Sequence, residues 1–247
     1  MAEPDLHERA SSFGSVAEAY DRFRPAPPAE AVDWVLGTAG GVAADIGAGT
    51  GALTRQLARR AGRVVAVEPD ARMAGVLRRR SPDIPALRGW AEALPLRPAC
   101  LDAVTVSSAW HWMDPDRTTA EVARVLRPGG VFGVIWNGAD RSVDWVAELL
   151  ETRVPSPGDR DLRTRHAFVL PPGSPFDAVE RRVVEWSLPL GPEELVGLAG
   201  TYSATITMAP DERERELARV AAAASSLAAS GPVELPMACR CWRAVRI

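Results

Sequence analysis

VAADIGAGTG, residues 42–51, is the stretch that decides the fold. Small apolar residues from Val42 lead into Asp45, which is typical of a buried strand, and glycines then occupy every second position up to Gly51. The residues after Gly51 have the apolar spacing of a helix. Glycine suits a tight turn that a ligand approaches closely, and the unpaired N–H groups at a helix start point at that ligand. The stretch therefore predicts a strand, a glycine turn and a helix that bind a nucleotide.

Two kinds of ligand fit the glycine spacing. Gly47-x-Gly49-x-x-Ala52 satisfies the dinucleotide fingerprint of an NAD site, in which a pyrophosphate lies on the helix N-terminus. S-adenosylmethionine (SAM) has no phosphate, and in a SAM site an acidic residue before the glycines faces the amino end of the ligand. Asp45 occupies that position, where its charge would repel a pyrophosphate and attract an ammonium or a sulfonium. Asp45 therefore favours SAM.

Asp45-Ile-Gly-Ala-Gly-Thr-Gly51 resembles the first motif of the class I SAM-dependent methyltransferases. A second segment, Glu121-Val-Ala-Arg-Val-Leu-Arg-Pro-Gly-Gly130, is similar to the same family, and NAD domains usually lack it. The resemblance implies an α/β fold, with a Rossmann-like, doubly wound, seven-stranded sheet and an antiparallel C-terminal hairpin. It covers most of the chain, from about Ser12 to Asn137 and more weakly after Val179.

An acid ends the second predicted strand, Arg63–Glu68, where it could accept hydrogen bonds from both hydroxyls of a ribose. Its pairing with the glycine turn indicates an adenosine ligand without separating NAD from SAM. The family resemblance extends to Gly89-Trp-Ala-Glu-Ala-Leu-Pro95, whose backbone and Glu92 side chain would approach the adenine. These patterns and the resemblance together predict that SAM contacts Asp45, Gly47, Ala48, Gly49, Gly51, Glu68, Pro69, Met73, Ala91, Glu92 and Ser107.

The N-terminal segment Ser12–Pro25 is predicted to form a helix that stops at Pro25, because the residue before a proline disfavours helix. Tyr20 and Arg24 lie four residues apart and would share one helical face. Tyr20-Asp-x-x-Arg24-Pro resembles the helical lid that many small-molecule methyltransferases fold over SAM. By that resemblance Tyr20 would pack against the methionine part and Arg24 would meet its carboxylate. The alternative is a surface helix with a solvated arginine.

An aromatic loop, Ala109-Trp-His-Trp-Met113, follows the fourth predicted strand, Leu101–Ser107. Ligands of open α/β sheets bind beyond the carboxyl ends of the strands, so we expect this loop beside the reacting end of SAM. His111 is the predicted catalytic residue, because histidine can take a proton from a phenol, an amine or an acidic carbon. Trp110, His111 and Trp112 are the predicted substrate contacts.

The chain has 247 residues, of which 47% are hydrophobic, and this suits a single α/β domain. Within residues 1–247 we expect a SAM-binding core at 12–140, an insertion that covers the substrate at 141–178, and C-terminal strands and helices at 179–247. Prolines and arginines are dense in the insertion. Its arginines could recognise a carboxylate, which the guanidinium fork matches, or could form a solvated loop surface.

Charge and cysteine content narrow the expected partners. The formal net charge of -3 gives no basic excess, so we expect no nucleic-acid partner. Three cysteines without framework spacing indicate a reducing, cytoplasmic setting. Cys239-x-Cys241 is expected in the core, and no metal site is predicted, because two further ligands are missing. The acidic start and the lack of a long apolar run predict no signal peptide and no membrane contact. We expect a monomer or a homodimer.

The predicted reaction is methyl transfer from SAM to an O, N or C atom of a small molecule, with S-adenosyl-L-homocysteine (SAH) as the second product. The nearest resemblance is to trans-aconitate-type carboxylate methyltransferases. A carboxylate acceptor needs no base, whereas a hydroxyl acceptor needs one. Two alternatives remain open. One is a SAM-binding catalyst of cyclisation or rearrangement that keeps the methyl group, and the other, which Asp45 disfavours, is an NAD-dependent oxidoreductase.

Overall fold

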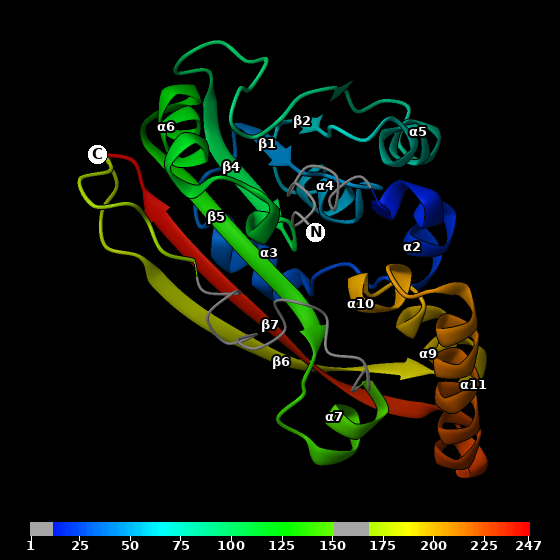
Figure 1. The fold of residues 1–247 in the computed structure, drawn as a ribbon. Coiled ribbons are helices and arrows are strands. Elements are labelled where there is room, and N and C mark those ends of the chain that lie inside the picture. Colours follow the sequence, from blue (N-terminus) through cyan, green and yellow to red (C-terminus); the bar gives the residue numbers. More distant parts are fainter. Residues whose placement is uncertain (1–11, 151–167) are drawn as a thin grey trace.

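The computed structural model describes residues 12–150 and 168–247. They form a seven-stranded mixed sheet with helices on both faces (Figure 1). The strand order is β3-β2-β1-β4-β5-β7-β6, in which β1 to β5 run parallel and β7 is antiparallel to both of its neighbours. The strands are β1 (Val42–Ile46), β2 (Arg63–Val67), β3 (Ala86–Leu87), β4 (Leu101–Ser107), β5 (Leu126–Ala139), β6 (Glu180–Leu190) and β7 (Val233–Val245).

The sheet is buried on both faces by side chains that alternate along each strand. In β1, Ala43 packs with residues of α3 and α4, whereas Ala44 and Ile46 pack in the cluster that includes α6. The helices and 3₁₀ turns are η1 (Ser12–Val16), α2 (Ala17–Phe23), α3 (Ala29–Leu36), α4 (Ala52–Leu57), α5 (Ala71–Arg80), η2 (Trp110–Trp112), α6 (Pro115–Val125), α7 (Asp144–Leu150), α9 (Pro192–Ala199), α10 (Ser203–Ile206), α11 (Pro210–Leu227) and η4 (Ala228–Ser230).

The C-terminal strands pair as predicted. β6 and β7 are antiparallel from Glu180, which lies opposite Arg243, to Leu190, which lies opposite Val233. The connection between β6 and β7 is long and carries α9, α10 and α11. These helices pack beside the C-terminal end of β6 and the N-terminal end of β7 (Figure 1). The predicted Rossmann-like sheet with an antiparallel C-terminal pair is therefore confirmed.

The N-terminal segment forms the 3₁₀ turn η1 and then α2, which ends at Phe23, ahead of Pro25. α2 packs against α5 on one side and α9 on the other (Figure 1). Ala17 and Tyr20 meet Met73 and Val76 of α5 in a small apolar cluster. The segment predicted as a lid is thus a packed helix with neighbours from both halves of the chain.

The predicted cover at residues 141–178 is described only at its two ends. α7 packs against the C-terminal helices through Leu149 and Leu150, and Phe168 and Phe176 join the main core. The arginines that could recognise a carboxylate or form a solvated surface lie outside the described residues: Arg153, Arg160, Arg163 and Arg165.

The two cysteines of β7 pack in the core, as predicted. Cys239 and Cys241 are buried on the face that α3 covers, with their Sγ atoms 3.9 Å apart. In the described part of the chain, no group of three or more His, Cys, Asp or Glu side chains could hold a metal ion. None of the helices described has the length and the apolar character needed to cross a bilayer.

Candidate functional site

The glycine turn after β1 has the backbone that its sequence predicts. Gly47, Gly49 and Gly51 have φ values of 64°, 56° and 89°, in the left-handed region that favours glycine. A Cβ atom on Gly47 would lie 2.8 Å from the Cβ of Ala109, so a side chain has no room there. The N–H groups of Gly47 and Ala48 donate to the carbonyl of Val67, which fixes the turn to the end of β2.

Glu68 lies immediately after β2 and is tied to the turn. Its Oε2 accepts a hydrogen bond from the N–H of Gly49 at 2.8 Å, and its Oε1 accepts one from the N–H of Asp70 at 2.9 Å. The side chain is buried, and burial raises the pKa of Glu68 to about 7 despite these two hydrogen bonds. Each oxygen keeps a lone pair for a further donor.

Asp45 is a more deeply buried carboxylate at the end of β1. Its Oδ2 accepts a hydrogen bond from the Thr54 hydroxyl at 2.6 Å, while its Oδ1 accepts none from the described residues. Burial, together with the nearby charge of Glu68, raises the pKa of Asp45 to about 7, although the hydrogen bond from Thr54 acts in the opposite direction. A buried oxygen without a donor costs free energy that a ligand with an N–H group would recover.

Two adjoining cavities lie at the carboxyl ends of the parallel strands. The first extends over Glu68, Met73 and Trp112, and the second over Asp45 and Asn137. Five residues line both and so join them: Tyr20, Gly47, Gly49, Ser107 and Ser108. This position is where open α/β sheets bind ligands.

The cavities bring together nearly all of the predicted cofactor residues. The predicted residues that line one cavity or both are Tyr20, Arg24, Asp45, Gly47, Ala48, Gly49, Glu68, Pro69, Met73, Ala91, Glu92 and Ser107. Gly51 lines neither, and is instead the N-cap of α4. Glu92 accepts a hydrogen bond at Oε1 from the N–H of Asp114, so its carboxylate also holds the loop before α6.

The aromatic residues after β4 form a 3₁₀ turn and do not continue the strand. Trp112 lines the first cavity. Trp110 points into the core, where its ring packs edge-on against Phe132 and Phe168, so the structure corrects its predicted contact with the substrate. A 3₁₀ turn places residues two apart on different sides of the turn, and this separates Trp110 from Trp112.

His111 lines neither cavity. Its ring lies between two tryptophans, with centroids 4.2 Å from Trp112 and 4.9 Å from Trp136. His111, the predicted base, therefore packs against Trp112, which lines the first cavity.

The contacts of Arg24 differ in part from those predicted. It lines the second cavity, but its Nε and Nη2 donate to the Oγ1 and the carbonyl of Thr201, both at 2.9 Å. Its guanidinium also stacks on Tyr202, 4.1 Å from the ring centroid, and lies 5.4 Å from the ring of Tyr20. Arg24 therefore fastens the end of α2 to the α9–α10 corner, a contact that no local sequence pattern predicts.

Sequence reasoning missed several of the lining residues, and Ser108 and Asn137 are two of them. Ser108 has a φ of 53°, which is uncommon for a residue other than glycine and turns the chain sharply at the cavity. Asn137 lines the second cavity, donates to the carbonyls of Pro25 and Ala26 and accepts from the indole N–H of Trp186. The rule that ligands bind beyond strand ends could have found Asn137, since it lies near the end of β5.

The chemistry of the two cavities suits an elongated ligand with a cationic end. Two buried carboxylates, Asp45 and Glu68, lie beside glycine backbone that leaves room for close approach. A cation would stabilise the ionised form of both carboxylates, whereas a pyrophosphate would meet like charge. The lone pairs of Glu68 suit a pair of hydroxyls, and the free Oδ1 of Asp45 suits an ammonium.

Comparisons with known proteins agree with this geometry. A family model described as a methyltransferase domain matches residues 44–134, which include Asp45, the glycine turn and Glu68. An uncharacterised methyltransferase of Mycobacterium tuberculosis is 44% identical over 236 residues, covering 94% of this chain and 95% of that protein. An uncharacterised methyltransferase-like protein of Schizosaccharomyces pombe is 28% identical over 205 residues, 79% of each protein. Among solved structures, a provisionally assigned type II methyltransferase from Anaeromyxobacter dehalogenans has a TM-score of 0.64 and 28% identity, covering 91% of this chain and 98% of that one.

Proposed function

Because this chain belongs to the class I SAM-dependent methyltransferases, we propose that the two adjoining cavities hold SAM and position it for methyl transfer to a small molecule. The observation that carries the proposal is the buried Asp45 beside the glycine turn, whose Oδ1 accepts no hydrogen bond from the residues that the structure describes. Asp45 would bind the ammonium of SAM.

Each part of SAM has a matching part of the site. Glu68 would accept hydrogen bonds from the ribose hydroxyls, and the apolar wall of the first cavity, with Met73 and Ala91, would hold the adenine. The second cavity, with Asp45 and Ala48, would hold the methionine part. Arg24 would approach the carboxylate of SAM only with the part of its guanidinium that Thr201 does not bind.

When bound, SAM supplies a methyl group that its sulfonium already activates. The protein's task is then to align the acceptor in line with the methyl–sulfur bond and to exclude water. Tyr20 and Ser108 line both cavities and so lie at the junction where adenosine and methionine would meet. SAH and a methylated acceptor are the expected products.

Two observations support a small acceptor. Tyr20 of α2 lines the junction of the cavities, and the chain has no basic excess that would attract a nucleic acid. We propose His111 as a base for an acceptor whose proton must leave, because its imidazole can take a proton near neutral pH; its ring lines neither cavity and packs against the cavity residue Trp112. His111→Gln should then lower turnover while the SAM dissociation constant stays within about twofold, and unchanged turnover would remove histidine from the mechanism.

Thermal melting with SAM, SAH, NAD and NADP tests the cofactor. SAM and SAH at about 100 times their dissociation constants should stabilise the fold by about 2.7 kcal/mol and raise the melting temperature by a few degrees. NAD and NADP should not. A rise with NAD alone would overturn the SAM assignment.

Release of SAH with a panel of small acceptors then tests the transfer. Carboxylates, phenols, amines and acidic carbon compounds would be compared at equal concentration. SAH should accumulate in proportion to methylated product. A product that forms without SAH would instead indicate a catalyst of rearrangement.

A further inference from the structure

We propose that Asp21 is a positioning residue for SAM: its paired ion bridges to α4 and α5 hold Tyr20 over the junction of the two cavities and slow the release of SAM. This inference rests on the proposed function. Tyr20 lines both cavities, and Asp21 is the next residue of the same helix. Asp21 itself lines neither cavity.

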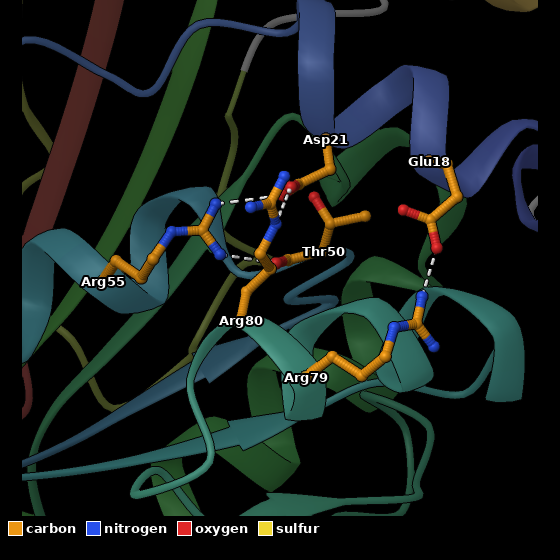
Figure 2. A network of polar contacts seen from close by, with 6 residues as sticks. All are labelled: Glu18, Asp21, Thr50, Arg55, Arg79 and Arg80. Atoms are coloured by element: carbon orange, nitrogen blue, oxygen red, sulfur yellow. Dashed lines mark hydrogen bonds and ion pairs between the residues drawn. The ribbon is translucent and has the colours of Figure 1, made fainter.

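Asp21 is a buried acid that two arginines share (Figure 2). Its side chain is 4% exposed. Its Oδ1 accepts from Nη2 of Arg55 in α4 at 3.0 Å, and its Oδ2 accepts from Nε of Arg80, the last residue of α5, at 2.9 Å. A carboxylate held on both oxygens by arginines fixes its helix in direction as well as in distance.

The bridge reaches the glycine motif directly. Nη1 of Arg55 donates to the carbonyl of Thr50 at 2.8 Å, and Thr50 lines the second cavity (Figure 2). α2, the glycine turn and α4 are therefore connected through the guanidinium of Arg55. Asp21 thus links the position of Tyr20 to the loop that would lie against the methionine part of SAM.

We infer that release of SAM moves α2, because Tyr20, a residue of this helix, lines both cavities at their junction. That movement would separate Asp21 from Arg55 and Arg80, and a buried charge that loses its partners is costly. The other contacts of α2, such as Arg24 with Thr201, fasten its C-terminal end to a different part of the molecule. A change at Asp21 should therefore loosen α2 on one side without unfolding the protein.

Glu18 supplies a matched control on the same helix. It pairs with Arg79, the neighbour of Arg80 in α5, but both side chains of this pair are exposed, 73% for Glu18 and 63% for Arg79 (Figure 2). Exposed ion pairs contribute little, because water solvates both charges and salt screens them. Glu18 also lines neither cavity.

The test is the dissociation rate of radiolabelled SAM from the protein of residues 1–247, chased with excess unlabelled SAH. Asp21→Asn should speed dissociation about tenfold, and Arg80→Gln, which removes one partner, about threefold. Glu18→Gln should stay within about twofold of the wild type. Asp21→Glu, which keeps the charge, should restore most of the slow rate.

The outcomes separate this inference from the proposed function. A wild-type protein that binds neither SAM nor SAH would overturn the function itself. A wild type that binds SAM, with an Asp21→Asn variant that melts earlier but releases SAM at the wild-type rate, would show that Asp21 only stabilises the fold. An equal acceleration in Glu18→Gln would also overturn the proposal, because it would trace the effect to surface charge.

Discussion

At the scale of single residues, the site depends on two buried carboxyl groups whose pKa values lie near 7. Burial raises the pKa of both Asp45 and Glu68 to about 7, well above their values in an unfolded chain. The folded, ligand-free protein therefore binds protons that the unfolded chain releases. The stability that Asp45 and Glu68 contribute is therefore fully present below about pH 4, and it is lost as the pH rises through about 7.

This linkage predicts opposite effects of pH on the empty and the loaded protein. Between about pH 6 and 7.5, the melting temperature without ligand should fall, while the affinity for SAM should rise severalfold, because a cation prefers the ionised carboxylates. Calorimetric titration across this range measures the affinity. Asp45→Asn should weaken binding about tenfold or more and flatten the pH dependence. An affinity that does not change with pH would contradict the assignment of these carboxylates.

The two tryptophans after β4 give a second prediction at this scale. Trp110→Ala should lower the free energy of unfolding by about 3–5 kcal/mol, because its ring fills the core between Phe132 and Phe168. Trp112→Ala should change stability less and SAM affinity more, because Trp112 lines the first cavity. Urea unfolding and calorimetry of both variants separate the two roles, and an equal loss of stability would contradict them.

At the scale of elements, the strand–turn–helix unit could be predicted because each local signal agreed. The acid, the alternating glycines and the following apolar spacing all specify one backbone. The aromatic segment could not be predicted in the same way. Trp110–Trp112 forms a 3₁₀ turn whose direction is set by tertiary packing on Phe132 and Phe168, which lie far away in the sequence. Local patterns carry no information on such partners.

Two glycines with positive φ give a matched prediction for the turn. Gly47→Ala combines backbone strain with a clash at 2.8 Å, whereas Gly129→Ala has strain alone, since no atom of the described residues lies within 4 Å of its Cβ position. Gly129→Ala should cost about 1–2 kcal/mol of stability and leave SAM affinity unchanged. Gly47→Ala should cost more and weaken SAM binding at least about tenfold. Equal SAM affinity in the two variants would show that the turn does not form the site.

At the scale of the whole molecule, much of the fold followed from the sequence, but the contacts across it did not. The predicted sheet and the predicted cofactor residues are brought together, with Gly51 as the exception among the latter. The anchoring of Arg24 on Thr201 and of Asn137 on the chain before α3 joins segments more than a hundred residues apart. The resemblance to trans-aconitate-type enzymes stays a prediction.

The sheet order predicts that the SAM-binding part is not independent. β7 covers the edge of β5 and connects it to β6, so a fragment of residues 12–140 would expose that edge and part of its core. The fragment should show no cooperative thermal transition by circular dichroism and no stabilisation by SAH, whereas residues 1–247 should show both. A cooperative transition of the fragment would contradict this dependence.

The place of β7 also has a consequence for how the protein is made. β7 lies between β5 and β6 in the sheet but is synthesised after both of them. While the ribosome extends the chain, the edge of β5 and the inner edge of β6 remain open, and either could pair with another nascent chain. The seven-stranded sheet is therefore complete only after the strand from Val233 to Val245 has been made. Until then, the open edges of β5 and β6 have to be kept from pairing with other chains.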